Sequence, residues 1–137
     1  MNIKFTKTHP KANMPHRANP TDFGADLTAV SMVITDDYIE YDTGIAIELP
    51  EGHAGLIMPR SSVSKYGLVL ANSVGLIDFL YKSSIKLRFK VVSDSAKVYH
   101  IGDKIGQLVI LPIPTPSFEE VDALDSTSRG GFGSTGV

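Results

Sequence analysis

The sequence contains no cysteine, and it has no long apolar run. The first absence excludes disulfide bonds, thiolate zinc sites and cysteine nucleophiles, and it makes a reducing compartment the simpler expectation. The second excludes a membrane-spanning helix, which needs about 18 consecutive apolar residues. Residues 1–7 also lack the apolar centre of a signal peptide. We therefore expect a cytoplasmic protein.

The chain also lacks a strong excess of charge of either sign, since its formal net charge is −2. It has no overall attraction to nucleic acid or to a membrane, so an anionic ligand must be held by local positive groups. The four histidines are scattered without the spacing of metal ligands, which disfavours a transition-metal site. With 137 residues, of which 42% are hydrophobic, the chain can fill the core of one domain.

Short β-prone runs separated by turn residues predict an all-β fold. The clearest run is 85–91, where apolar residues alternate with basic ones in the period of a half-buried strand. The other runs are 45–49, 54–58, 98–101 and 108–111, with turn signals at 42–44, 50–52, 93–95 and 101–103. Many short strands at close spacing predict a sandwich, jelly roll or barrel. Only residues 61–66 look helical, with a serine to cap the start and Gly67 to end the helix.

An arginine and two hydroxyls, Arg60, Ser61 and Ser62, lie at the start of this short helix. Free backbone N–H groups collect there, and a guanidinium reaches anionic oxygens, so the segment is a candidate phosphate site. An ordinary capped turn with a solvated Arg60 accounts for the same residues equally well.

A carboxylate, Asp78, follows the apolar run 74–77, and Tyr81 comes three residues later. An aspartate held at the end of a rigid strand can act as a general base, although a turn-forming aspartate fits the local sequence too. The glycine-rich end, residues 129–137, lacks the lysine and helix of a Walker motif, so it is not a P-loop. By composition alone that end is a disordered tail.

Taken in order, these segments resemble the five motifs of the trimeric dUTPases, from about residue 15 to the C-terminus. The corresponding residues are 24–29, then 59–65 with 67–68, then 70–78 with Tyr81, then 102–108, and finally Arg129 with 131–136. The resemblance implies a jelly-roll-like β fold with one short helix, assembled as a homotrimer with active sites at the subunit interfaces. Residues 1–116 would form the β-rich core, and residues 117–137 would be an arm that closes over an active site.

The resemblance also implies an activity, the hydrolysis of dUTP to dUMP and pyrophosphate, which limits uracil in DNA and supplies dUMP. Water would attack the α-phosphorus with the help of Mg²⁺, and Asp78 would orient or deprotonate that water. Asp26 would reach the metal through its water shell.

The resemblance assigns substrate contacts to each part of the nucleotide. Asn72 and the hairpin backbone at Gly75 and Ile77 would bind uracil, and Tyr81 would pack under the deoxyribose. The phosphates would contact Arg60, Ser61, Ser62 and Gln107. In the arm, Phe132 would stack on uracil, and the phosphate chain would be held by Arg129, Gly133, Ser134 and Thr135.

The sequence departs from the family pattern in three places, the first of which is Phe23-Gly24-Ala25, a variant of the usual Ala-Gly-aromatic start. Phe79-Leu80 and Ser83-Ser84 replace the usual small or polar pair and the usual Gly-Glu, and Arg129 lies only three residues before Phe132. The altered residues motivate an alternative, a regulatory or binding module of the same fold with weak turnover. A dCTP deaminase is disfavoured, because it needs a carboxylate at the pyrimidine amino group and segment 68–77 has none. Short length and altered motifs suit a phage or viral enzyme.

Overall fold

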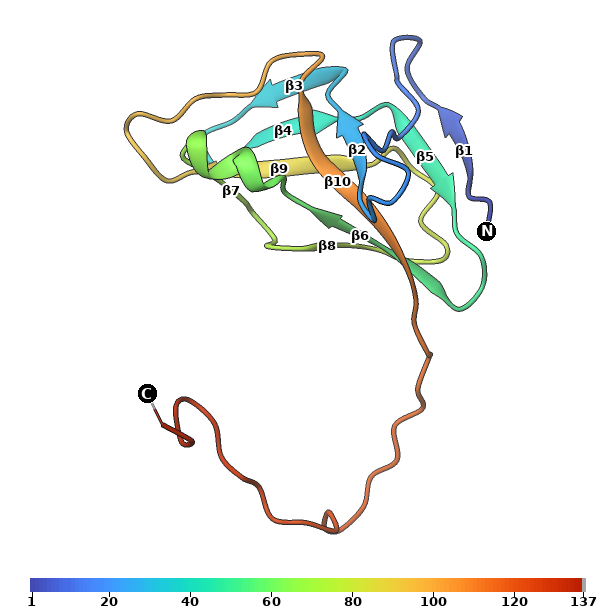
Figure 1. Ribbon diagram of the computed structural model, residues 1–137, viewed down its shortest axis with the longest axis vertical. Helices are drawn as coiled ribbons and strands as arrows, with labels where there is room; N and C mark the ends of the chain where they lie inside the picture. Colours follow the sequence, from blue (N-terminus) through green and yellow to red (C-terminus); the bar gives the residue numbers. More distant parts are fainter. Residues whose placement is uncertain (137) are drawn as a thin grey trace.

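The fold is built from ten short strands and one 3-10 helix, and it was obtained as a computed structural model that describes residues 1–136 (Figure 1). Along this part of the chain the elements are β1 (Lys4–Lys7), β2 (Ala25–Thr28), β3 (Ser31–Ile34), β4 (Ile39–Asp42), β5 (Ile45–Glu48), β6 (His53–Met58), η1 (Ser61–Lys65), β7 (Leu68–Leu70), β8 (Gly75–Ile77), β9 (Lys86–Val91) and β10 (Lys104–Pro112).

The strands pair antiparallel in three sheets. One four-stranded sheet has the order β2-β10-β6-β8, the other has the order β3-β4-β9-β7, and β1 pairs with β5. The prediction of an all-β, jelly-roll-like fold is confirmed. No helix in residues 1–136 is both long and apolar enough to cross a bilayer.

The alternation predicted for residues 85–91 appears directly in β9. Leu87 and Phe89 are buried, with 1% and 0% of their surface exposed, while Lys86, Arg88 and Lys90 face outward. The buried side chains of β9 and β4 join those of β2, β6 and β10 in one apolar cluster, so the two large sheets share a core. At Gly106 the sheets approach so closely that an added Cβ would lie 2.5 Å from Leu87 Cδ2.

The strand predicted at residues 98–101 is wrong, because this segment has no strand pairing. It is held by packing instead. The Tyr99 ring is buried and stacks on Tyr66 with ring centroids 4.2 Å apart, and the Tyr41 hydroxyl donates a 3.0 Å hydrogen bond to the Tyr99 carbonyl oxygen. Apolar residues in this run therefore serve as an anchor for a loop that crosses the core.

The predicted helix at residues 61–66 exists as η1, but the predicted serine cap is wrong. Arg60 occupies the N-cap position, and η1 has no side-chain cap hydrogen bond. Gly67 ends the helix as predicted, since it follows the C-cap residue Tyr66 with a φ of +66°, a conformation that favours glycine.

The chain leaves the sheets after β10. Ile113 N–H still donates a 2.8 Å hydrogen bond to the Gly52 carbonyl oxygen, and from Leu111 to Gly136 every residue is exposed. Figure 1 shows this C-terminal segment, residues 113–136, leaving the body and following a wide curve that turns back at its far end. We refer to residues 4–112 as the body.

Candidate active site

The first group of candidate residues lines a cavity of about 660 Å³ at one face of the β2-β10-β6 sheet. Asp26 comes from β2, Gln107 from β10, and Arg60 with Ser61 from the junction of β6 and η1. These strands are direct neighbours, with Gln107 paired to both Asp26 and Met58. Sheet pairing thus gathers residues from three separate motifs, and we call this space the phosphate cavity.

The charged groups of the phosphate cavity are paired around Asp26. The Asp26 carboxylate, with 16% of its side chain exposed, lies 2.9 Å from Lys104 Nζ and 3.4 Å from Arg60 Nε. Two cations therefore face this carboxylate, and because Asp22 also lines the cavity while Lys104 does not, Arg60 is the cation of the lining that can reach an anionic ligand. Lys104 is an addition that the motif comparison did not single out.

Two further phosphate candidates differ in their placement. Gln107 Nε2 donates a 3.2 Å hydrogen bond to the Pro59 carbonyl oxygen, and a side chain at Gly24 would collide with the Gln107 amide. The glycine is therefore required for Gln107 to hold its position. Ser62 is half-buried within η1 and does not line the cavity, whereas Ser61 does.

The nucleoside candidates lie in a second cavity, of about 450 Å³, which we call the nucleoside cavity. It is lined by Asn72 and Tyr81 together with Ala71, Glu40, Lys86 and Arg88. Gly75 and Ile77 form β8 and pair with Ile57 and Gly55 of β6, and Ile77 is only 8% exposed. Asn72 thus lies in the turn between β7 and β8, which belong to different sheets, and Tyr81 lies in the loop that follows β8.

The altered residues after Asp78 lie in a loop that side-chain hydrogen bonds connect to the body. The Tyr81 hydroxyl donates a 2.8 Å hydrogen bond to the Ser84 carbonyl oxygen, and the Ser84 hydroxyl donates in turn to Asp42 Oδ1. Thr8 Oγ1 donates to Ser84 Oγ over 3.1 Å. Ser84 therefore ties the Tyr81 loop to the body at the position where the family usually has glutamate.

Asp78 itself lies in a third cavity, of about 210 Å³, lined also by His53, Ala54 and Phe79. Its side chain is exposed, and its carbonyl oxygen accepts a 3.0 Å hydrogen bond from Tyr81 N–H. Asp78 thus begins a turn at the end of β8, as the sequence indicated, and its carboxylate faces solvent.

Within one chain, Asp78 and Arg60 are far apart. Ile77 pairs with Gly55, so Asp78 lies level with Ala54, and Arg60 is six residues further along extended chain. At roughly 3.3 Å per residue, this places the two side chains on the order of 20 Å apart along β6. Reacting groups must come within about 3–3.5 Å, so one chain does not bring Asp78 to a phosphate held by its own Arg60.

The nucleoside cavity contains three charged residues that the sequence did not indicate as site residues. Glu40 of β4 pairs with Arg88 of β9, and its carboxylate lies 2.7 Å from Arg88 Nε and 3.6 Å from Lys86 Nζ. The hydrogen bond to Glu40 raises the pKa of Arg88 above its ordinary value. Alternation in β9 predicted that Lys86 and Arg88 face outward, but only the strand pairing reveals that they meet Glu40 beside Asn72.

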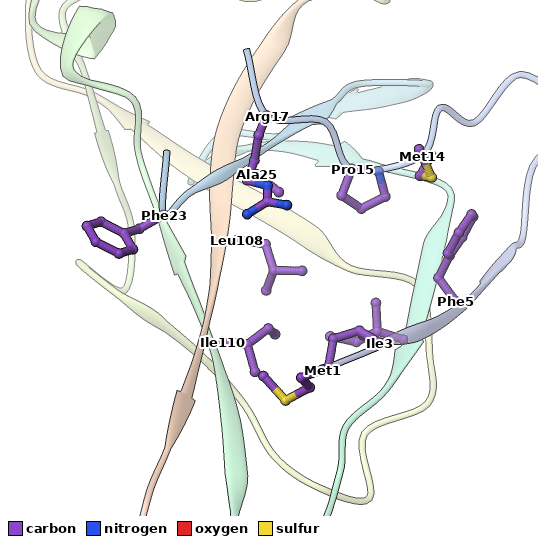
Figure 2. Close-up of a pocket in the computed structure, with 11 residues that line it drawn as sticks. Met1, Ile3, Phe5, Met14, Pro15, Arg17, Phe23, Ala25, Leu108 and Ile110 are labelled. Atoms are coloured by element: carbon purple, nitrogen blue, oxygen red, sulfur yellow. The ribbon is translucent and has the colours of Figure 1, made fainter. Parts of the chain in front are cut away.

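A fourth cavity, of about 340 Å³, is mostly apolar and contains none of the predicted site residues. Figure 2 shows Leu108 and Ile110 of β10 and Met1 and Ile3 of the N-terminal segment facing the same space. Among residues 1–136, Arg17 is the one charged side chain in its lining, so this cavity offers little for phosphate chemistry.

The predicted arm residues lie outside all of these cavities. Arg129, Phe132, Gly133, Ser134 and Thr135 are exposed in the C-terminal segment, and Phe132 has a positive φ of 51°. The hydrogen bonds of residues 128–136 stay within the segment, as in Ser134 N–H to the Gly131 carbonyl oxygen at 3.1 Å. Val137 belongs to the predicted arm but lies outside the described residues.

Comparison with known protein families gives one consistent result. A family model described as dUTPase matches residues 10–136. The deoxyuridine 5'-triphosphate nucleotidohydrolase of Rhodococcus erythropolis is 40% identical over 143 residues, which cover 99% of this chain and 87% of the relative. The enzyme of the same name from Escherichia phage T5 is 36% identical, with 98% of each chain covered.

Solved structures that resemble this chain belong to the same family as its sequence relatives. The dUTPase of Staphylococcus bacteriophage 80alpha with dUPNHPP aligns with a TM-score of 0.84 and 30% identity over 99% of both chains. That protein is described as controlling the transfer of virulence genes. A mutant dUTPase from phage phi11 of S. aureus aligns with a TM-score of 0.76 and 27% identity, over 92% of this chain and all of that one, and it is described as coordinating a structural Mg(II) ion.

Proposed function

This chain belongs to the dUTPase family and is a dUTP diphosphatase, and from that premise we propose that Asp78 activates the water that attacks the α-phosphorus of dUTP. The bond between the α-phosphorus and the bridging oxygen breaks, so the products are dUMP and pyrophosphate. Asp78 is suited to this role because its carboxylate is exposed to water and fixed by the strand before it.

The phosphate cavity is the observation that best supports a nucleoside triphosphate as the substrate. A triphosphate needs several donors and cations at once, because phosphoryl transfer depends mainly on positioning and charge stabilisation. Arg60, Ser61 and Gln107 line one cavity and supply them, and Ser62 adds its hydroxyl once η1 adjusts around the phosphates. Lys104 neutralises Asp26 from the opposite side to Arg60.

The separation of Asp78 from Arg60 supports a homotrimer with active sites at the subunit interfaces. Because about 20 Å divides the two residues, we propose that the phosphate cavity of one subunit meets the segment from β8 to Tyr81 of another. Sedimentation of the purified protein tests this assembly, and a monomer that turns over dUTP would contradict it.

The residues around Asp26 fit a magnesium ion. Mg²⁺ prefers carboxylate and phosphate oxygens and keeps several waters, and this cavity has the carboxylates of Asp22 and Asp26 in its lining and room for a hydrated ion. When bound, Mg²⁺ would supply positive charge that offsets the phosphate charge met by the attacking water. Asp26 would hold its water shell, while Arg60 and Gln107 orient the phosphate chain.

The nucleoside cavity accommodates the other half of the substrate. Asn72 and the β8 backbone at Gly75 and Ile77 would bind uracil, and Tyr81, whose hydroxyl is already fixed by Ser84, would pack under the deoxyribose. A ring held in this way leaves less room for a 2′-hydroxyl.

The C-terminal segment would act as the arm that completes the site. Its glycines allow it to close over bound nucleotide, with Phe132 on uracil and the phosphate chain held by Arg129, Gly133, Ser134 and Thr135. These groups are exposed in the free chain, so they are accessible to a bound nucleotide. We place the reaction in the cytoplasm, that of the host if the chain is phage-encoded, where nucleotide pools are found.

Pyrophosphate release from dUTP, dTTP, dCTP and UTP, with and without Mg²⁺, tests the proposal. We expect turnover of dUTP that depends on Mg²⁺ and little turnover of the other three. Ammonia released from dCTP would favour a deaminase, and tight binding without product would favour the regulatory module.

A further inference from the structure

The Tyr81 loop, residues 78–84, connects β8 to the segment that leads into β9. The side chains of Phe79, Leu80 and Tyr81 are all exposed, so burial contributes little to holding this loop in place. In residues 1–136, the side-chain hydrogen bonds from the loop to the remainder of the body all involve one residue, Ser84. The position of the loop therefore depends on the surroundings of Ser84.

The Ser84 hydroxyl uses both its donor and its acceptor. It donates a hydrogen bond to Asp42 Oδ1, at the end of β4, and accepts one over 3.1 Å from Thr8 Oγ1, directly after β1. The same Asp42 oxygen accepts a 2.8 Å hydrogen bond from Gly44 N–H, and Thr8 N–H donates over 2.8 Å to the Gly44 carbonyl oxygen. Ser84 is thus held between β4 and the N-terminal segment.

The backbone that follows Ser84 is also fixed. Ile85 is 0% exposed, its N–H donates a 2.8 Å hydrogen bond to the Ile45 carbonyl oxygen, and its carbonyl oxygen accepts one of 2.8 Å from Thr43 Oγ1. Because Ile85 is buried and hydrogen-bonded through both of its backbone groups, the adjacent carbonyl group of Ser84 is a well-fixed acceptor.

The Tyr81 side chain is held by this acceptor. Its hydroxyl donates a 2.8 Å hydrogen bond to the Ser84 carbonyl oxygen, and its backbone N–H donates one of 3.0 Å to the Asp78 carbonyl oxygen. The ring lies between these two points and lines the nucleoside cavity together with Asn72. Tyr81 therefore forms a fixed wall of that cavity.

A fixed wall discriminates between ligands by shape. A ligand with one extra group is rejected only when the side chain it meets cannot move aside, because movement removes the steric cost. Deoxyribose and ribose differ by one 2′-hydroxyl. The firmness with which the Tyr81 ring is held thus sets how strongly a ribonucleotide is rejected.

We propose that Ser84 is a positioning residue, which holds the Tyr81 ring through its bonds to Asp42 and Thr8 and so sets discrimination between deoxyribose and ribose. The inference rests on the proposed function, which places the sugar against Tyr81. It gives a role to a serine at which this sequence departs from the family pattern, and to the N-terminal segment through Thr8.

The test compares Ser84→Ala, Ser84→Thr and Thr8→Val with a matched control, Ser83→Ala. Ser83 is the neighbouring serine; it is exposed, and its side chain makes no hydrogen bond within residues 1–136. Calorimetry, with UMP as a competitor of dUMP, measures binding of both nucleotides to the full chain. Steady-state kinetics measure turnover of dUTP and UTP, and thermal unfolding of each variant verifies the fold.

Ser84→Ala should reduce the ratio of dUMP to UMP affinity about 5- to 30-fold, the equivalent of one hydrogen bond. Ser84→Thr keeps the hydroxyl and should restore most of the wild-type ratio. Thr8→Val removes one of the two bonds and should change the ratio in the same direction by a smaller factor, while Ser83→Ala should behave as the wild type. A role in stability alone would lower the unfolding temperature and weaken both nucleotides equally, which leaves the ratio unchanged.

A ratio in Ser84→Ala within about two-fold of the wild-type ratio would overturn the inference. An equal fall in Ser83→Ala would do so as well, since it would reveal a general loosening of the loop. If Ser84→Ala did not fold, the exposed position Thr8 would decide, and an unchanged ratio in Thr8→Val would overturn the inference.

Failure of the proposed function would look different. A wild-type protein that bound dUMP and UMP equally would contradict the placement of the sugar against Tyr81, and with it the role of Ser84. A wild-type protein that discriminated, with variants that discriminated equally well, would leave that placement intact and overturn only the role of Ser84.

Discussion

The body and the C-terminal segment differ in how their functional groups are held. In the body, Asp26, Arg60 and Gln107 have fixed partners, and strand pairing sets their positions before any substrate binds. In the C-terminal segment, Arg129 and Phe132 are exposed and contact only their own neighbourhood in the described chain. On this difference rests our proposal that the body recognises the nucleotide and that the segment acts after recognition.

The largest effect is expected from Asp78→Asn, which removes the base and keeps the shape of the body. Turnover of dUTP should fall on the order of 10² to 10⁴, the contribution of a positioned general base. Binding of dUMP should persist, because Asp78 lies outside the nucleoside cavity. Rapid-quench measurement of dUMP formation provides the test, and an unchanged rate would remove Asp78 from the mechanism.

A smaller effect is expected from Arg60→Gln, which weakens the phosphate cavity. Loss of a guanidinium that contacts phosphate should raise the KM for dUTP roughly 10- to 100-fold. The matched control is Lys65→Gln, a basic residue of the same helix η1 that does not line the cavity. Equal KM values for the two variants would contradict the role of Arg60 in holding phosphate.

The contribution of buried hydroxyls to the stability of the body can be tested at Tyr41 and Tyr99. Tyr41→Phe removes the donor to the Tyr99 carbonyl oxygen and should lower the free energy of unfolding by about 1–2 kcal/mol. In residues 1–136 the buried hydroxyl of Tyr99 has no hydrogen-bond partner, so Tyr99→Phe should be neutral or stabilising by up to about 1 kcal/mol. Urea denaturation measures both, and equal losses would contradict this assignment.

Because of the same two tyrosines, we expect the free energy of unfolding to depend on pH in the alkaline range and not near neutrality. Burial raises the pKa of Tyr41 and of Tyr99 above the ordinary value of 10.0. A raised folded-state pKa gives stability that is complete below pH 10 and is lost as the pH rises through the folded-state pKa. Urea midpoints measured from neutral pH upward should therefore begin to fall only above about pH 10, and a flat profile there would contradict burial of the two hydroxyls.

Sequence patterns predicted best those features that depend on residues close together in the chain. The alternation around Leu87 and Phe89 predicted β9, and Gly67 predicted the end of η1. The motif order also indicated the residues that meet in the phosphate cavity, since β2, β6 and β10 are neighbours.

Other features depend on tertiary contacts that a linear pattern does not contain. Residues 98–101 have the composition of a strand, yet packing of Tyr99 against Tyr66 decides their conformation. Glu40 meets Lys86 and Arg88 only through the register of β4 on β9. The serine cap of η1 failed because Arg60 occupies the N-cap position.

The most direct test of the division between body and C-terminal segment is a chain that ends at Ser128, measured for unfolding temperature, dUMP binding and dUTP turnover in one preparation. The removed residues contribute no buried side chain, so we predict an unfolding temperature within about 2 °C of the full chain. We predict that dUMP binding changes much less than turnover, which should fall at least about 100-fold. Normal turnover by the shortened chain, or loss of its fold, would contradict the account.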